Sequence, residues 1–206
     1  MSISASASSE LRKRLADLFP LSSAQLDALQ AHYELLVRWN RVLNLTRIGD
    51  AREAAERHYA EALFVASRLP GGRLRIADVG SGAGFPGFPV AVARPDCTVT
   101  LIESHQRKAV FLRESSRAVK NVRVVAARAE AVTDTFDLVL SRAVSFEDLL
   151  PALPRLGSVF VLLTGPEAPP GDVGIDWTGV EKLPWGKQRW VRFGVSRETR
   201  GARRQE

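Results

Sequence analysis

The stretch that decides the fold is "ADVGSGAGFPGFP" at residues 77–89, which follows the apolar run "LRIADV" at 74–79. Gly80, Gly82 and Gly84 allow positive φ angles and leave no Cβ between the chain and a ligand. The helix-compatible segment that comes next, at 87–94, presents free N–H groups at its start. A strand, a glycine-rich turn and a helix in this order predict a ligand-binding loop at the carboxyl edge of a parallel sheet.

Strand-length apolar runs continue at 98–103, 122–127, 136–141 and 158–164, with helix-compatible segments at 104–119 and 146–156 between them. Strands that alternate with helices predict an α/β, Rossmann-like sheet with right-handed crossovers and both faces covered. Two further strands, "TGVEKL" and "RWVRFGV", follow without a helix between them, so we expect an antiparallel hairpin at the sheet edge. The first, second and fourth runs are rich enough in Val, Ile and Leu for buried positions.

The chain before residue 70 shows helical patterns alone. Apolar positions repeat at helical spacing from Leu11 to Phe19, Ser22 and Gln25 form a capping box, and Asp50 opens a third helix through "REAAERHYAEALFVASRL". We therefore predict an N-terminal helical cap at 1–70 and a Rossmann-like domain with a basic C-terminal segment at 71–206.

The net charge of +6 is concentrated at one end. From Lys182 onward there are eight Lys or Arg residues and two acidic ones, so the rest of the chain is neutral as a whole. A polyanion partner and a solubilising tail both fit this distribution. The single cysteine, Cys97, fits a reducing compartment, and no apolar run has transmembrane length. We expect a cytoplasmic protein without a membrane partner, and a monomer.

The spacing in the loop favours one cofactor over another. Dinucleotide sites prefer G-x-G-x-x-G, whereas here the spacing is G-x-G-x-G, Phe85 stands where the third glycine would, and Pro86 removes an N–H donor. Asp78 precedes the loop, and Glu103 ends the next strand, where a carboxylate can accept hydrogen bonds from ribose hydroxyls. Acidic residues on both sides of this loop predict S-adenosylmethionine (SAM) as the cofactor, with contacts at Asp78, Gly80, Gly82, Gly84, Phe85 and Glu103.

Few residues near the predicted site carry acid–base or covalent chemistry. No His, Asp or Glu cluster has metal-ligand spacing, so we expect no metal, and Cys97 lies away from the carboxyl edge, as a small buried hydrophobe. Guanine N7 needs alignment rather than a general base, because it carries a lone pair and no proton. Arg142, at the end of the fourth strand, is the expected catalytic residue, where its planar fork suits the cofactor or a guanine edge; a surface ion pair is the alternative.

With "WNRVLNLTRI", "RHYAEAL", "DVGSGAGFPG", "RPD", "NVRVVAARAE" and "SRAV" in this order, the chain resembles the RsmG (GidB) family, the bacterial 16S ribosomal RNA guanine-N7 methyltransferases. The resemblance runs from Trp39 to Gly165. It implies SAM-dependent methylation of a loop guanine near the decoding centre, with 16S rRNA or the small ribosomal subunit as partner. It also implies cofactor contacts at Gly80, Phe85, Ala129, Glu130 and Arg142, and a part in shaping the entrance for Asn44, Thr46, Arg57 and His58, for which capping or packing remains an alternative.

The chain departs from the family pattern at three positions. Glu61 and Ala62 stand where the family often has Asp and Ser, and Thr164 stands where a Lys is common. The basic C-terminal segment is a candidate to replace that lysine. Two other hypotheses stay open: a methyltransferase for another RNA or a small molecule, and an RNA-binding ribosome-assembly factor without catalysis.

Overall fold

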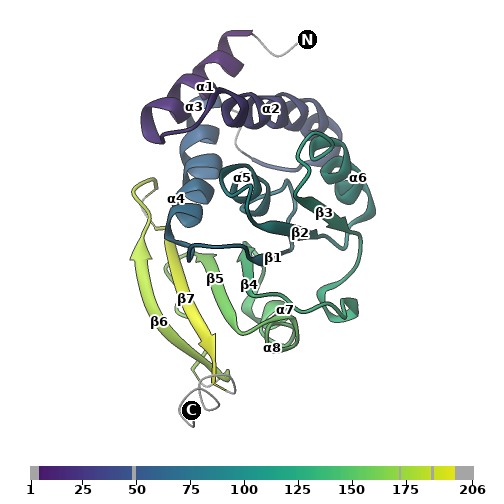
Figure 1. Ribbon diagram of the computed structural model, residues 1–206, viewed down its shortest axis with the longest axis vertical. Coiled ribbons are helices and arrows are strands. Elements are labelled where there is room, and N and C mark those ends of the chain that lie inside the picture. Colours follow the sequence, from purple (N-terminus) through teal and green to yellow (C-terminus); the bar gives the residue numbers. More distant parts are fainter. Residues whose placement is uncertain (1–4, 48–49, 172, 187, 198–206) are drawn as a thin grey trace.

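The computed structural model describes residues 5–47, 50–171, 173–186 and 188–197. Within these ranges the strands form a single mixed sheet in the order β3-β2-β1-β4-β5-β7-β6 (Figure 1). The strands are β1 (Arg75–Val79), β2 (Thr98–Ile102), β3 (Val122–Val125), β4 (Leu138–Arg142), β5 (Val159–Thr164), β6 (Ile175–Lys182) and β7 (Trp190–Ser196).

The pairing of the strands confirms the predicted topology. Parallel pairs join β1 to both β2 and β4, β2 to β3, and β4 to β5. β7 is antiparallel to β5 and to β6, so the last two strands form the expected edge hairpin, although β6 begins at Ile175, earlier than the sequence pattern indicates. The order reverses between β1 and β4, which places the loops after these two strands at a topological switch point.

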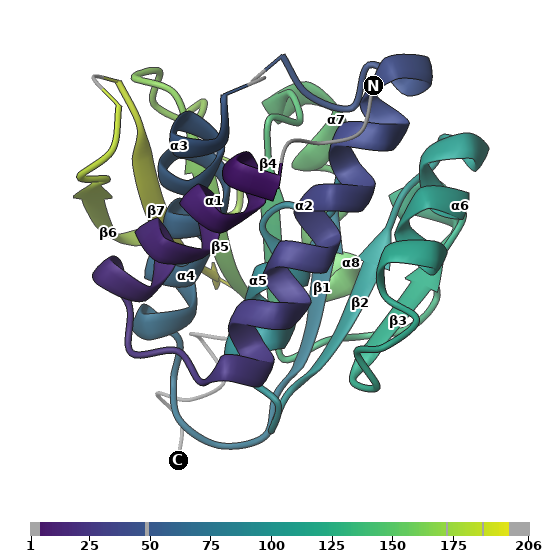
Figure 2. The same cartoon turned by 90° about the horizontal axis from the view of Figure 1, so that it is seen from above.

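The helices lie on both faces of the sheet, as predicted (Figures 1 and 2). One buried cluster joins residues from α1 through α6 to one face, and a second joins α7 and α8 to the other. The helices are α1 (Ala5–Leu18), α2 (Ser23–Leu43), α3 (Ala51–Ala54), the π-helical turn η1 (Ala55–Ala60), α4 (Glu61–Arg68), α5 (Gly87–Ala93), α6 (Gln106–Ser115), the 3-10 turn η2 (Ala129–Ala131), α7 (Phe146–Leu149) and α8 (Leu153–Leu156).

Two predicted helices of the sheet region differ from the observed ones. The segment at 146–156 divides into α7 and α8, because Pro151 between them has no N–H to donate to the preceding turn. The segment at 104–119 is shorter, since α6 ends at Ser115, whose Oγ donates to the Leu112 carbonyl 3.1 Å away. The Leu112 carbonyl also accepts from Ser116 N at 3.0 Å, so the last helical hydrogen bond of α6 is retained at this end.

The N-terminal helices begin where their caps predict. Ser22 and Gln25 form the reciprocal capping box of α2, and the Asp50 side chain accepts from Glu53 N at the start of α3. α3, η1 and α4 replace the one predicted helix, with a π-helical turn in its middle. Leu29 of α2 and Leu101 of β2 belong to the same buried cluster, so the helices before residue 70 share a core with the sheet. We keep the cap boundary near residue 70 as a proposal.

Two features of the buried residues match the sequence pattern. After an exposed first residue, every position of β1 and β2 is buried, and β4 is buried up to Ser141. Cys97 is a free, buried thiol that packs within the larger cluster. Across the part of the chain that the structure describes, no helix combines the length and apolar character that crossing a membrane requires.

Candidate active site

The glycine loop turns away from β1 beside the end of β2. The N–H groups of Gly80 and Ser81 both donate to the Ile102 carbonyl, at 2.9 and 3.1 Å. Gly80, Gly82 and Gly84 all have positive φ, between 56° and 89°, a region that disfavours other residues. A Cβ at Gly80 would stand 2.4 Å from Val144 Cγ2, so the loop and the chain after β4 touch only because this position has no side chain.

Two buried carboxylates hold the loop from behind. The oxygens of Glu103 accept from Gly82 N at 2.8 Å and from His105 N at 2.7 Å. Asp78 Oδ2 accepts from Gly87 N at 3.0 Å, at the first residue of α5. Phe88 N donates to the Gly84 carbonyl. The prediction that the start of this helix offers free N–H groups to a ligand is therefore wrong for Gly87 and Phe88, whose donors are used within the protein.

The carboxyl group of Asp78 has a raised pKa. Burial raises its pKa to about 7, against the effect of the hydrogen bond from Gly87, which lowers the pKa. Its second oxygen, Oδ1, is buried and has no hydrogen-bond partner within the described structure. A carboxyl group in this state alternates between the charged and neutral forms near neutral pH.

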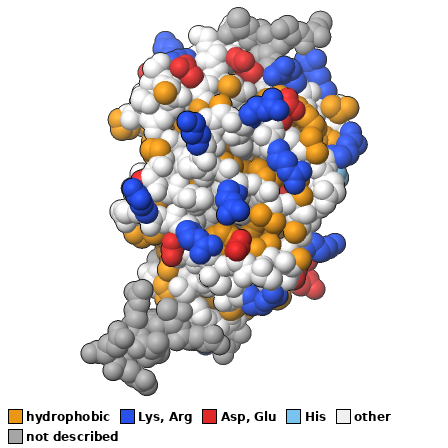
Figure 3. Space-filling view, turned by 45° about the vertical axis from the view of Figure 1, so that its right-hand side comes forward, with side chains coloured by type: hydrophobic (Ala, Val, Ile, Leu, Met, Phe, Trp, Pro, Cys, Tyr) orange, Lys and Arg blue, Asp and Glu red, His pale blue; other side chains and the backbone are white. Residues whose placement is uncertain are grey.

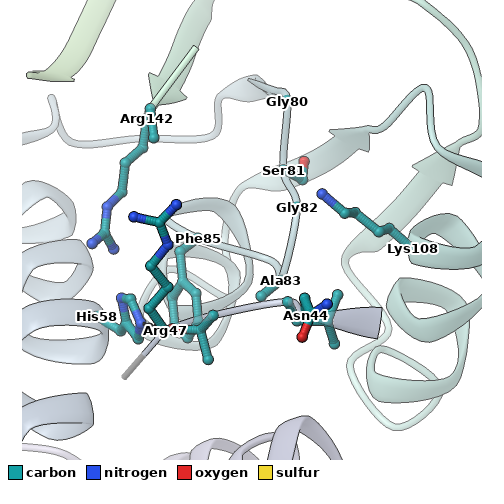
Figure 4. Close-up of a pocket in the computed structure, with 13 residues that line it drawn as sticks. Asn44, Arg47, His58, Gly80, Ser81, Gly82, Ala83, Phe85, Lys108 and Arg142 are labelled. Atoms are coloured by element: carbon teal, nitrogen blue, oxygen red, sulfur yellow. Dashed lines mark hydrogen bonds between the residues drawn. The ribbon is translucent and has the colours of Figure 1, made fainter. Parts of the chain in front are cut away.

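A cavity of about 350 Å³ opens in front of the loop (Figure 4). Gly80 to Ala83 form one wall, and Phe85, His58 and the chain after α2 form the other. Three cationic side chains reach it from different elements, Arg47 from the chain after α2, Lys108 from α6 and Arg142 from the end of β4. Its lining, within the described chain, holds no carboxylate. The lining residues are Asn44, Leu45, Thr46, Arg47, His58, Gly80, Ser81, Gly82, Ala83, Phe85, Lys108, Arg142 and Ala143.

A second cavity of about 240 Å³ lies on the other side of Gly80. Apolar side chains of Ile102 and Val144 contribute to its walls, together with the polar residue of the η2 turn, Glu130. Ala129 and Glu130, predicted to surround an adenine, both line this cavity. Because Gly80 lines both cavities, one elongated ligand can extend across the loop from the first cavity to the second.

The structure thus divides the predicted cofactor residues into two groups. Gly80, Gly82, Phe85 and Arg142 line the first cavity, and Gly80, Ala129 and Glu130 line the second. Asp78, Gly84 and Glu103 line neither. Gly84 faces the interior, where a Cβ would meet His32 Nε2 and Phe88 Cβ at 3.2 Å. A direct cofactor contact by these last three residues stays a prediction, while their support of the loop is visible.

Phe85 sits inside an aromatic cluster. Its ring stacks on His58 with centroids 4.7 Å apart and meets the edges of Tyr59 and His32. Burial lowers the pKa of His58 to about 2, with further lowering by Arg142 and other nearby arginines, so its imidazole is neutral at physiological pH. A 2.7 Å hydrogen bond joins His58 Nε2 to Thr46 Oγ1 and fixes the ring. His58 therefore contributes a flat, uncharged surface to the cavity.

Arg142 is held by a buried ion-pair network. Glu61, with no exposed surface, lies 3.4 Å from Arg142 Nη2 and accepts from Arg189 Nη2 at 3.0 Å. Arg142 Nη2 also donates to the Arg57 carbonyl at 2.9 Å. Burial lowers the pKa of Arg142 to about 10, which still leaves it charged at neutral pH. Arg142 therefore does pair with a carboxylate, as the alternative expected, but that carboxylate is buried and not on the surface.

Of the entrance residues implied by the resemblance, some line the first cavity and some have a structural role in capping or pairing. Asn44 ends α2 in the left-handed conformation, and it lines the first cavity with Thr46 and His58. Arg57 instead pairs with Glu53 through its side chain. At position 164, Arg192 Nε donates to Thr164 Oγ1 at 3.0 Å, so a guanidinium from the basic segment lies next to the position where a lysine is common in the family.

Sequence reasoning missed Arg47 and Lys108 as site residues. Lys108 stands in the first turn of α6, a helix that begins at the carboxyl edge of β2, and this placement was a usable signal. Arg47 lies inside the motif "WNRVLNLTRI", directly after Thr46, and this position was its available signal. Among the described residues, no group of three or more His, Cys, Asp or Glu side chains is arranged to hold a metal ion.

Comparison with known proteins decides the family. The family model described as rRNA small subunit methyltransferase G (GidB) matches residues 25–165, more than half of the chain. The chain belongs to this family. The matched region of the RsmG family includes both cavities and the glycine loop, but not Arg189. Ribosomal RNA small subunit methyltransferase G from Halorhodospira halophila is 44% identical over 139 residues, which cover 66% of each chain, so the matched stretch spans about two thirds of that relative.

Solved structures support the fold of this chain. A SAM-dependent methyltransferase from Aquifex aeolicus aligns with a TM-score of 0.57 at 17% identity, over 70% of this chain and 93% of that one. Magnesium protoporphyrin IX methyltransferase from Synechocystis, solved with bound SAM, aligns with a TM-score of 0.59 at 13% identity, over 80% and 97%. At these identities the likeness establishes a Rossmann-like methyltransferase fold, as predicted.

Proposed function

We propose that this protein uses SAM to methylate N7 of a loop guanine in 16S rRNA. The observation that carries the proposal is the pair of cavities that meet at Gly80, within the region that matches the RsmG family. The family's description names small-subunit rRNA methylation, and the solved methyltransferases of the same fold include one with bound SAM.

The residues present fit such a cofactor. The second cavity combines apolar walls at Ile102 and Val144 with the Glu130 carboxylate, a suitable lining for an adenosine. The first cavity offers the cations Arg142 and Lys108, which suit an α-carboxylate. SAM supplies, when bound, an electrophilic methyl group on a sulfonium. Gly80 allows close approach between the two cavities, since it has no side chain.

The chain's own contribution is alignment rather than proton transfer. Guanine N7 has a lone pair and no proton to remove, so no general base is needed. His58 is neutral and Phe85 is flat and buried, and together they offer an apolar wall against which a base can lie. Arg142 is the proposed catalytic residue: Glu61 and the Arg57 carbonyl fix one nitrogen, and other N–H donors of the guanidinium remain for substrate or cofactor.

We infer that the partner is the small ribosomal subunit or its RNA, and that the protein acts in the cytoplasm as a monomer. The absence of carboxylates from the described lining of the first cavity supports an anionic partner. Arg47 and Lys108, at opposite sides of that cavity, are suitably charged to approach phosphates of the RNA around the target base.

A test of the proposal measures SAM binding and methyl transfer separately. Titration calorimetry with purified protein is expected to show one SAM site. Radiolabelled SAM is then supplied with small subunits, naked 16S rRNA or guanosine nucleotides, and mass spectrometry locates the methyl group at guanine N7. Transfer to nucleotides alone would favour a small-molecule enzyme, and absence of SAM binding would favour an assembly factor. Unchanged N7 methylation of 16S rRNA from a deletion strain would also refute the proposal.

A further inference from the structure

The face formed by α6 and β3 carries a concentration of positive charge. Residues 104–128 include seven Lys or Arg and one acidic residue, Glu114. The neutrality of the chain before Lys182 therefore hides a local excess. We call these seven the α6–β3 basic surface; all but the partly buried Lys108 are exposed. They are Arg107, Lys108, Arg113, Arg117, Lys120, Arg123 and Arg128.

These seven side chains differ in their pairing from about half of the other cations that the structure describes. Arg12, Arg14, Arg94 and Arg189 belong to that half, in which a carboxylate lies within ion-pair distance. Within the described ranges, none of the seven has an ion pair or a side-chain hydrogen bond. A space-filling view toward this side shows Lys and Arg side chains spread over the face and fewer acidic ones (Figure 3). The fold leaves this charge available.

The surface is continuous with both cavities. Lys108, in the first turn of α6, lines the first cavity, and Arg128, after β3, lines the second. From there the basic residues continue along α6, a ten-residue helix about 15 Å long, to Arg117 and Lys120 beyond its end. A polyanion bound along this face would therefore reach the mouth of the site.

We propose that the α6–β3 basic surface binds the phosphate backbone of the substrate RNA. Five of the seven residues are arginines, whose planar forks match phosphate oxygens. The one exposed aromatic ring among 104–128 is His105, and Phe111 is buried, so the surface has no Phe, Tyr or Trp platform on which bases could stack. It contributes affinity and position without reading sequence, and base selection is left to the cavity. This assignment rests on the proposed rRNA methyltransferase function.

The test replaces three residues that line neither cavity, in the variant Arg113→Gln/Arg117→Gln/Arg123→Gln. The matched control, Lys13→Gln/Arg73→Gln/Arg155→Gln, removes three exposed, unpaired charges from α1, the chain before β1 and α8. Fluorescence anisotropy with a labelled 16S rRNA hairpin is recorded from 50 to 300 mM KCl. We expect roughly tenfold weaker binding for the first variant and a salt slope smaller by about 2, from the loss of three phosphate contacts. The control is expected to keep most of the slope.

Methyl transfer and SAM calorimetry on the same proteins separate this inference from the proposed function. With the α6–β3 variant we expect a higher KM for RNA and an unchanged SAM affinity. A salt slope and KM equal to those of the control would overturn the surface assignment while leaving the methyltransferase in place. If the wild type binds RNA but transfers no methyl group, while the α6–β3 variant binds RNA more weakly, the proposed reaction is overturned and the surface assignment is retained.

Discussion

At Glu61, a carboxylate without exposed surface lies between the guanidinium groups of Arg142 and Arg189. Removing its charge leaves two buried cations without their counter-ion. We expect Glu61→Gln to lower the free energy of unfolding by about 3–5 kcal/mol, measured by urea denaturation. The control is Glu181→Gln, which breaks the exposed pair with Arg68 and should cost about 0–1 kcal/mol. Equal losses in the two variants would contradict a structural role for the buried network.

Arg142 has the most direct predicted effect on activity. Arg142→Ala should lower kcat on small subunits at least a hundredfold, or roughly 3 kcal/mol of barrier, because it removes a donor held at the edge of the cavity. The fold should persist, since Glu61 keeps its pairing with Arg189. Arg142→Lys, which retains the charge without the fork, is the control. Near-UV circular dichroism checks the fold, and normal turnover of Arg142→Ala would remove it from the site.

Asp78 and the buried histidines oppose one another in their effect on acid stability. Between about pH 4 and 7, folded Asp78 keeps a proton that the unfolded chain releases, so its contribution to stability increases as the pH falls. Burial lowers the pKa of His32 to about 3 and that of His58 to about 2, so stability due to these groups is lost as the pH falls below 6.5.

The Asp78→Asn variant tests this balance. Without the opposing contribution of Asp78, the unfolding free energy should fall more steeply between pH 6.5 and 4.5 than it does in the wild type, by about 1.4 kcal/mol per pH unit. Urea titrations at the two pH values measure the difference. Parallel pH profiles would mean that Asp78 titrates at its ordinary value.

At the scale of elements, the glycine loop depends on one close contact. Gly80 has a φ of 72°, and an added Cβ would clash with Val144 Cγ2. Gly80→Ala should cost about 1–3 kcal/mol of stability and weaken SAM binding, because both backbone strain and overpacking result. Gly80→Ala/Val144→Ala should recover the steric part, and Gly71→Ala, with open space around it, is the neutral control. If the double variant does not recover stability, the loss in Gly80→Ala is due to backbone strain at its positive φ and not to the clash with Val144.

The elements also show which structural features a sequence can predict. Apolar runs and caps act locally, which explains why the five parallel strands and the start of α2 were predicted correctly. Pro151 was visible in the sequence, but a helical pattern continues on both sides of it, so the division into α7 and α8 was missed. The π-helical turn was missed for another reason. Its extra residue orients side chains toward residues that are distant in the sequence, and a local pattern does not show such contacts.

At the scale of the whole molecule, the role of the C-terminal basic segment as a binding site for a polyanion has to be revised. Arg189, Arg192 and Arg197 all have partners within the fold: Glu61, Thr164 and Asp176. Lys187, Arg200, Arg203 and Arg204 lie outside the described residues. A polyanion partner for this segment, one of the two interpretations of its charge, would need cations that are free to bind it, and these contacts argue against that role for the first three arginines.

We therefore expect Arg192→Gln/Arg197→Gln to lower stability by about 1–2 kcal/mol and to leave the salt slope of RNA binding nearly unchanged. Urea denaturation and anisotropy titrations on the same preparations measure both quantities. A slope reduced as much as in the α6–β3 variant would show that these two arginines also contact phosphate.

Distance along the chain explains most of what the sequence could not predict about the site. The residues of the glycine loop, Ala129, Glu130 and Arg142 lie at strand ends, where topology alone brings them together. The pairing of Glu61 with Arg189 joins residues 128 positions apart. No local sequence pattern can predict such a pair. That Glu61 stands where the family often has Asp indicated only that this position departs from the family pattern.

The π-helical turn also has a consequence for how this chain can change in length. One residue removed between His58 and Glu61 would restore regular α-helical spacing and rotate everything after it by about 100° relative to what precedes it. His58 then could not face Phe85 while Glu61 faces Arg142. We expect homologous chains to exchange side chains freely in this helix but to keep the number of residues between these two constant, so that insertions and deletions accumulate elsewhere.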